Sequence, residues 1–332
     1  MVILAFSPVL LSAAENPRQK TDSTQLKQSY KRPQSIPFPA DNSYSPEAEI
    51  LGRTLFFDSR LSGSGSLACA SCHNPSFGWE DGLALGHGEG MRQLGRHTPS
   101  ILNAAWGDLY FWDGRAASLE AQALGPIGNP AEMNQSLSQL PEKLSKIADY
   151  RKMFQSAYPG EGITASTIGK AISVFERTVA SLPTPFDAWI NGDESAISEA
   201  AKHGFILFNS EAGCSACHSG WRMTDNRFHD IGLPDEDRGR VLIAPAEPNA
   251  ERGFKTPTLR NVARRAPYMH DGSLSDLTTV MAHYISGGTD RPSRDNKIHA
   301  LNLSQKDIED LKALLASLSE PDQSFPTPML PQ

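Results

Sequence analysis

The stretch Cys69-Ala70-Ser71-Cys72-His73 returns later in the chain as Cys214-Ser215-Ala216-Cys217-His218, and the two stretches contain all four cysteines of the 332 residues. Cys-x-x-Cys-His attaches a c-type haem: the thiols bond to the haem vinyl groups, and the histidine coordinates the iron. A redox dithiol needs no histidine directly after it, and a four-thiolate zinc site would leave both histidines without a role. We therefore predict two covalently bound haem c groups. The first would be held by Cys69, Cys72 and His73, and the second by Cys214, Cys217 and His218.

The composition is that of a globular protein, with 39% hydrophobic and 21% charged residues. A chain of this length is long enough for two domains of ordinary size. The formal net charge is -7, and no basic patch stands out that would meet the phosphates of a nucleic acid. We therefore expect no nucleic-acid partner.

The first 14 residues form an apolar run that ends in Leu-Leu-Ser-Ala-Ala before Glu15. This run resembles the apolar part and the cleavage region of a secretory signal, although the usual basic residues do not precede it. We interpret it as a truncated signal segment, with a disordered apolar terminus as the alternative. Bacterial haem attachment takes place outside the cytoplasm, so we expect a periplasmic protein. No other segment approaches the roughly 20 apolar residues that span a bilayer, so no membrane span is expected after processing.

The two haem motifs lie in related surroundings. Gly52-Arg53-Thr54-Leu55-Phe56 precedes the first motif and Gly204-Phe205-Ile206-Leu207-Phe208 precedes the second, and each stretch ends a helical pattern. Ser45 is a candidate N-cap of the first helix, with Pro46 in its first turn, and the second helix is predicted from about residue 195 to 208. This arrangement predicts an internal duplication of a helix, a loop and a haem motif.

Each unit also has a predicted closing helix. Residues 164–182 and 304–318 carry apolar side chains at helical spacing, and Pro183 follows the first of them. No run of alternating strands appears, and Gly86-His87-Gly88-Glu89-Gly90 is predicted to be a loop because it lacks the strand–helix setting of a dinucleotide site. We predict an all-α fold with two cytochrome-c-like domains, over residues 30–190 and 191–322.

Three further motifs accompany the haem sites. They are Phe111-Trp112-Asp113-Gly114-Arg115-Ala116, Thr256-Pro257-Thr258-Leu259-Arg260-Asn261 and Pro267-Tyr268-Met269-His270-Asp271-Gly272. With two haem motifs in this order, the chain resembles the bacterial di-haem cytochrome c peroxidase and MauG superfamily over roughly residues 46 to 320. Each motif alone is weak evidence for this superfamily, but the set of motifs is specific to it.

The resemblance implies that the haem of His73 is the peroxide site, with Glu132 and Gln122 in its distal pocket. A carboxylate can move a proton from one peroxide oxygen to the other, and an amide can orient the molecule. The same resemblance places Trp112 between the haems, where it would pass electrons. The alternatives are a solvated helix-end carboxylate for Glu132 and an ordinary core aromatic for Trp112.

The second haem separates the branches of the superfamily. Standard members supply a methionine as the sixth iron ligand downstream of His-Asp-Gly, and Tyr284 stands at that position here, as in the MauG branch. A hard, anionic phenolate stabilises oxidised iron, whereas a soft thioether raises the reduction potential. The resemblance therefore implies iron ligation by His73, His218 and Tyr284. Met281, one helical turn earlier, is the competing ligand.

Two positions depart from the family pattern. His87 is displaced from the place of the distal histidine that some peroxidases use, so a His73/His87 pair is not expected. The family's calcium site uses an asparagine where this chain has His97, a poor calcium ligand. A calcium ion held by the backbone carbonyls of Arg265 and Pro267 is therefore left open.

The resemblance implies a MauG-like enzyme that uses hydrogen peroxide to oxidise a partner protein, at tryptophan or tyrosine side chains, through a high-valent di-haem state. One alternative is a cytochrome c peroxidase supplied with electrons by a small cytochrome c or a cupredoxin. The other is a di-haem cytochrome that only carries electrons. The Glu132/Gln122 pair argues against the carrier, and Tyr284 argues against the standard peroxidase.

Overall fold

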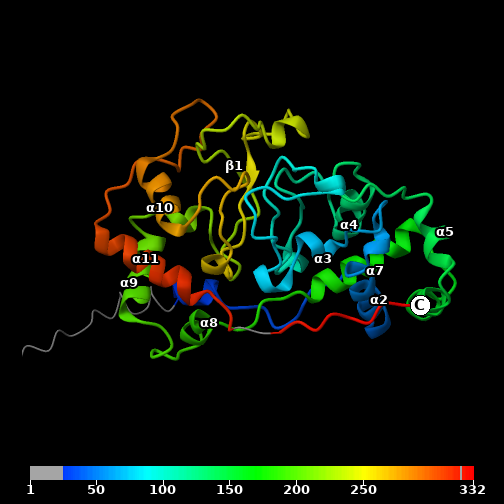
Figure 1. Ribbon diagram of the computed structural model, residues 1–332. Helices are drawn as coiled ribbons and strands as arrows, with labels where there is room; N and C mark the ends of the chain where they lie inside the picture. The colour runs from blue at the N-terminus through cyan, green and yellow to red at the C-terminus, as the bar shows by residue number, and fades with distance from the viewer. Residues whose placement is uncertain (1–24, 322–323) are drawn as a thin grey trace, which may run out of the picture.

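The protein is described from a computed structural model, which covers residues 25–321 and 324–332 (Figure 1). The predicted signal segment lies outside these residues. The fold is mainly helical, as predicted. The helices are α2 (Pro46–Phe56), α3 (Cys69–Cys72), α4 (Leu119–Gly128), α5 (Leu140–Ser145), α6 (Ala148–Ala157), α7 (Ala165–Thr178), α8 (Pro185–Ile190), α9 (Glu199–Asn209), α10 (Leu277–Ser286) and α11 (Gln305–Ser317). Strands β1 (Phe228–His229) and β2 (Phe254–Lys255) form a short antiparallel pair.

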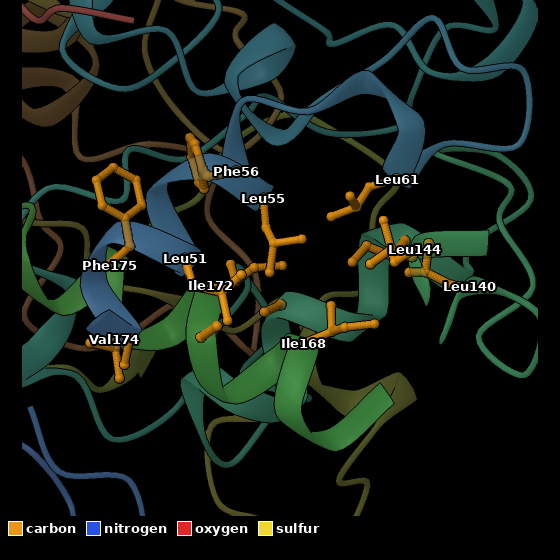
Figure 2. Packing of buried hydrophobic residues seen from close by; sticks show 14 of the residues in the cluster. Leu51, Leu55, Phe56, Leu61, Leu140, Leu144, Ile168, Ile172, Val174 and Phe175 are labelled. Atoms are coloured by element: carbon orange, nitrogen blue, oxygen red, sulfur yellow. The ribbon is translucent and has the colours of Figure 1, made fainter. Parts of the chain in front are cut away.

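The first haem unit is built on the crossing of α2 and α7. The side chain of Ser45 accepts a hydrogen bond from the amide of Ala48, which confirms the predicted cap of α2. The helices approach so closely at Gly52 that a Cβ there would lie 1.9 Å from the carbonyl oxygen of Ala171. Around this crossing lies the first hydrophobic cluster, shown in Figure 2, which includes Leu51, Leu55, Phe56, Ile168, Ile172 and Phe175.

The second haem unit repeats this crossing with α9 and α11. A Cβ on Gly204 would lie 2.1 Å from the carbonyl oxygen of Asp310, so Gly204 occupies the place that Gly52 has in the first unit. The second hydrophobic cluster surrounds this pair and includes Phe205, Phe208, Leu311, Leu314 and Leu315. The predicted duplication of a helix, a haem motif and a closing helix is therefore confirmed.

Two helix ends differ from the prediction. The helix of the second unit begins after its N-cap Ser198 rather than near residue 195, because Asp193 accepts the amide of Ser195 and holds a separate turn there. The closing helix of the first unit ends at Thr178, and Val179 beyond it is no longer helical, with φ -74° and ψ 71°. The amide of Asn103 donates to the carbonyl oxygen of Val179, 2.8 Å away.

Each hydrophobic cluster also receives a residue from the far end of the chain. Tyr30 packs in the second cluster, and Phe325 packs against the first. The domain limits 30–190 and 191–322 stay a prediction. Among the described residues, no helix combines the length and apolar character needed to cross a membrane.

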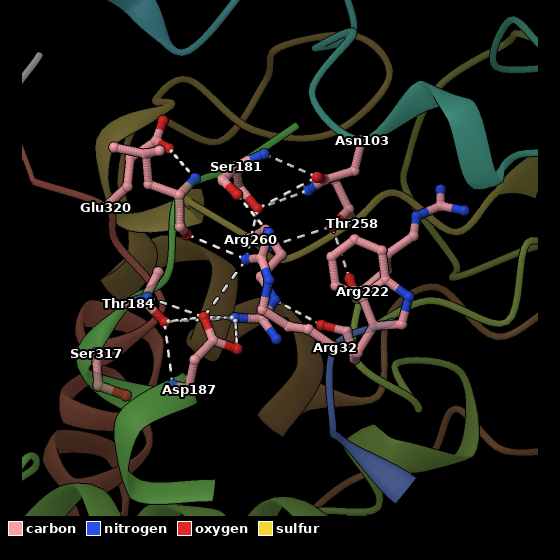
Figure 3. A network of polar contacts seen from close by, with 12 residues as sticks. Arg32, Asn103, Ser181, Thr184, Asp187, Arg222, Thr258, Arg260, Ser317 and Glu320 are labelled. Atoms are coloured by element: carbon pink, nitrogen blue, oxygen red, sulfur yellow. Dashed lines mark hydrogen bonds and ion pairs between the residues drawn. The ribbon is translucent and has the colours of Figure 1, made fainter. Parts of the chain in front are cut away.

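The segment between α7 and α8 is held by a buried polar network (Figure 3). The guanidinium of Arg260 is fully buried, and its Nη1 lies 2.9 Å from each carboxylate oxygen of Asp187. Burial lowers the pKa of Arg260 to about 10. Asn103 and Ser181 exchange hydrogen bonds beside this pair, and Arg32 donates to Ser181 and Asp187. The network joins the N-terminal segment, the connection at 181–187 and the Thr256–Asn261 motif.

Candidate functional site

Both haem motifs line one cavity of about 890 Å³. The residues of the motifs that line it are Cys69, Cys72, His73, Cys214, Cys217 and His218. All four cysteines are free thiols in the structure and are partly buried. The sequence predicted two haem sites, and the structure shows that both motifs face the same cavity.

The two histidines are oriented in the same way. The Nδ1 of His73 lies 3.1 Å from the carbonyl oxygen of Trp79, and the Nδ1 of His218 lies 2.9 Å from that of Met223. Trp79 and Met223 both adopt a positive φ, 67° and 55°, so the loop after each motif turns in the same way. Each hydrogen bond leaves Nε2 as the nitrogen available to iron. Burial lowers the pKa of both imidazoles, which favours the neutral form that binds a metal.

Two cations in the wall of the cavity fit the carboxylates of haem. Lys255 and Arg222 both line the cavity, and no carboxylate of the described residues lies within ion-pair distance of either. Lys255 donates to the carbonyl oxygen of Leu109, and the Nε of Arg222 has no partner. Burial, together with the charge of Arg222, lowers the pKa of Lys255 to about 8. Buried cations require anionic partners, and haem propionates have this charge, so the residues present fit two haem groups.

The predicted peroxide-binding pair lies in the wall of this cavity. Gln122 lies on α4, and Glu132 lies in the turn that follows this helix. The predicted loop at residues 86–90 packs on that turn: the amide of Glu89 donates to the carbonyl oxygen of Glu132 at 2.7 Å. A Cβ on Gly88 would lie 1.9 Å from the carbonyl oxygen of Ala131, so only glycine allows this contact. Loop and turn together position Glu132.

The electrostatic surroundings of Glu132 suit a group that handles protons. Burial raises the pKa of its carboxyl group, and the charge of Arg115 only partly opposes this. Arg115 is itself engaged, because its Nη1 lies 3.0 Å from both carboxylate oxygens of Asp113 and its guanidinium stacks over the ring of Phe111 at 3.5 Å. A carboxyl group whose pKa rises toward neutrality both accepts and donates a proton readily.

Trp112 lines the cavity and is held by contacts on several sides. Its indole Nε1 donates to the carbonyl oxygen of His97 at 2.8 Å, and its own carbonyl oxygen accepts from the amide of Lys255 at 2.8 Å. Its ring meets that of His270 edge to face, with the ring centres 6.3 Å apart. The indole therefore has a fixed orientation within the cavity wall.

The side chains at the predicted calcium position form an ion-pair cluster. His97 places Nδ1 2.7 Å from the carbonyl oxygen of Leu83 and Nε2 3.4 Å from Glu80. Glu80 also accepts from Arg265 at 2.6 Å. Burial lowers the pKa of His97, but the hydrogen bond and charge of Glu80 outweigh it and raise the pKa overall. His87 is not one of the described residues that line the cavity.

Tyr284 and Met281 lie on α10, three residues apart, and both line the cavity. The helix is anchored at its start by the side chain of Asp276, which accepts the amide of Thr279, and near its end by His283, whose Nε2 lies 2.9 Å from the carbonyl oxygen of Ile231. Burial raises the pKa of the Tyr284 phenol above its usual range, and the sulfur atoms of the second haem motif raise it further. The phenol and the second haem motif line the same cavity.

The sequence did not single out Arg222, Lys255 and Glu176, which carry buried charges or a buried carboxyl group in the cavity wall. Lys255 directly precedes the Thr256–Asn261 motif, and this was a signal that could have been used. Arg222 and Glu176 gave no such signal, because their burial depends on segments distant in the sequence.

The cavity and its residues define a class of protein, and comparisons with known proteins agree with it. A family model described as di-haem cytochrome c peroxidase matches residues 46–195. The chain belongs to the di-haem cytochrome c peroxidase and MauG family, as the motifs predicted, and it is a peroxidase-type enzyme. Membership and the two cysteine pairs imply two haem c groups.

Individual relatives narrow the comparison. The methylamine utilization protein MauG of Methylorubrum extorquens is 48% identical over 313 residues, which cover 93% of this chain and 89% of the relative. The cytochrome c551 peroxidase of Pseudomonas aeruginosa is 34% identical and covers 86% of this chain and 83% of its own. Among solved structures, a MauG-like protein associated with microbial copper homeostasis matches with a TM-score of 0.81 and 32% identity, over 88% of this chain and 95% of its own.

Proposed function

We propose that this protein is a MauG-like di-haem enzyme, which uses hydrogen peroxide to oxidise tryptophan or tyrosine side chains of a partner protein by long-range electron transfer. One observation carries the proposal: a single cavity contains both haem motifs, the Glu132/Gln122 pair and the Tyr284 phenol. The relatives named MauG, 48% and 44% identical over more than nine-tenths of the chain, support it.

The haem groups supply the redox chemistry when bound, since their iron accepts the oxidising equivalents of peroxide. Glu132 takes the proton from one peroxide oxygen and delivers it to the other, which leaves as water. The amide of Gln122 donates a hydrogen bond that orients the peroxide. Trp112 passes electrons across the cavity, with its indole held by the carbonyl oxygen of His97.

Tyr284 is the proposed sixth ligand of the second iron, in place of the methionine of standard peroxidases. Met281 lies on the same face of α10, and its ligation would favour the cytochrome c peroxidase function. The proposed location is the periplasm, and the proposed partner is a protein of that compartment that donates electrons. A calcium ion held by the carbonyls of Arg265 and Pro267 stays a prediction.

The test is the reaction of the fully ferric holoprotein with one equivalent of peroxide, followed by absorption spectroscopy. We expect both haems to change without prior reduction, and we expect ascorbate to leave both ferric while dithionite reduces them. The matched variants are Tyr284→Phe, which should abolish the shared change, and Met281→Leu, which should preserve it. The proposal would be refuted if Met281→Leu altered the second haem, Tyr284→Phe left it unchanged, and the protein had to be half-reduced before it reacted with peroxide. That result would establish the cytochrome c peroxidase function.

A further inference from the structure

The wall of the cavity contains a second carboxyl group that no step above uses. Glu176 lies in the last turn of α7, lines the cavity and is 3% exposed. Its Oε2 is enclosed and has no hydrogen-bond partner among the described residues. An ionised carboxylate in such a place is costly, since burial of an unpaired charge requires several kcal/mol.

The groups around Glu176 are committed elsewhere. Arg177, its neighbour in sequence, places its two terminal nitrogens 2.7 and 3.1 Å from the carboxylate of Glu120 on α4. The phenol of Tyr110 donates to the carbonyl oxygens of Ala104 and Gly107. Neither Arg177 nor Tyr110 therefore neutralises Glu176.

The charged side chains of α2, the other helix packed on α7, make separate contacts. Glu47 is exposed, Glu49 accepts from Tyr44, and Arg53 donates to the carbonyl oxygen of Pro326. Cys69 packs against the first hydrophobic cluster, which contains Phe175, the residue directly before Glu176. The charge of Glu176 raises the pKa of the Cys69 thiol in addition to burial. Once Cys69 is bonded to haem it no longer titrates. Glu176 therefore lies near the attachment edge of the first haem.

Burial raises the pKa of Glu176 to about 8, the charge of Arg177 opposes this, and that of Glu120 adds to it. A pKa in this range means that a modest change of charge in the cavity decides whether the group keeps its proton. The pKa of Glu120, by contrast, is held at about 2: burial raises it, but the hydrogen bonds from Arg177 and Asn42 outweigh burial.

We propose that Glu176 is a proton-carrying residue coupled to the redox state of the first haem. Withdrawal of one electron leaves one positive charge in the cavity, and loss of the Glu176 proton to solvent leaves one negative charge, so the net charge is unchanged. Return of the electron is matched by uptake of one proton. The inference requires the first haem to be attached at Cys69 and Cys72, and does not depend on which partner protein is oxidised.

A potentiometric titration of the holoprotein tests this coupling. Between pH 6 and 10 the midpoint potential of the first haem should fall as pH rises. At its steepest, the equilibrium constant for reduction should change nearly tenfold per pH unit, which corresponds to about 59 mV per pH unit. Glu176→Gln should lessen this dependence, and the part that remains belongs to other groups of the cavity such as Lys255, whose pKa of about 8 lies in the same range. Glu47→Gln is the matched control: Glu47 is exposed and does not line the cavity, so its variant should keep the dependence. An unchanged slope in Glu176→Gln would overturn the proposal.

Infrared difference spectroscopy gives a second measurement that needs no variant at Glu176. Oxidation of the wild-type holoprotein should remove a protonated-carboxyl band, and Glu132→Gln should retain this change. A wild-type difference spectrum without such a band, or a band that disappears in Glu132→Gln, would refute the role of Glu176. Neither measurement uses peroxide, so a failure of the proposed peroxide function leaves both results interpretable.

Discussion

The two helix crossings offer the sharpest test of the structure, through Gly52→Ala and Gly204→Ala. The added Cβ would lie 1.9 Å from the carbonyl oxygen of Ala171 in the first case and 2.1 Å from that of Asp310 in the second. Cβ atoms in proteins essentially never approach another heavy atom to less than 3.0 Å, so the two helices of each pair must separate by about 1 Å. A backbone carbonyl cannot rotate away as a side chain can. We therefore expect the upper end of the usual overpacking cost, about 3 kcal/mol.

Thermal unfolding of the holoprotein measures this cost. A loss of about 3 kcal/mol should lower Tm by roughly 6–12 °C, at about 2–4 °C per kcal/mol for chains of 150–250 residues. Gly95→Ala is the matched control, because a Cβ at Gly95 would meet no atom within 4 Å and its φ is not positive. A Tm of Gly52→Ala or Gly204→Ala within about 1 °C of the Tm of the control would refute the close crossing. Such a difference corresponds to a loss of no more than about 0.5 kcal/mol.

Four further predictions follow from the site and the fold. Mass spectrometry of the matured protein should find two haems bonded to each chain, and a mass with fewer would contradict the attachment motifs. Glu132→Gln should slow peroxide cleavage by ~10²-fold in stopped-flow measurements, and Gln122→Ala should do so less, since orientation is easier to replace than proton transfer; a rate within a few-fold of the parent would exclude Glu132. Arg260→Met should cost about 3 kcal/mol in denaturant unfolding, because the buried charge of Asp187 then keeps only the longer, 3.5 Å ion pair with Arg32; a loss under about 1 kcal/mol would argue against the Arg260–Asp187 pair. The raised pKa of Glu176, from 4.5 to about 8, means that the folded protein keeps a proton that the unfolded chain releases. Stability should therefore fall as pH rises through this window, and Glu176→Gln should lessen the fall.

Local signals in the sequence were enough for the haem motifs and for most helices. Cys-x-x-Cys-His is a covalent attachment site, so its chemistry depends on five neighbouring residues only. Ser45 caps the helix that follows it, as predicted. The predicted helices that begin at Thr164 and Ser304 have these two residues as their N-caps. The start of the second unit's helix was placed too early, because the side chain of Asp193 closes a turn that apolar spacing does not reveal.

The sequence by itself determined that the chain is a helical protein with two haem attachment sites, because attachment, capping and helical periodicity act over a few neighbouring residues. Only the tertiary structure decided that both motifs face one cavity, and that Lys255, Arg222 and Glu176 lie in its wall. It also decided why Gly52 and Gly204 are glycines, since each touches a backbone carbonyl more than 100 positions away. Burial and close approach are properties of segments distant in sequence, and they set the charge state of a side chain and the space around it.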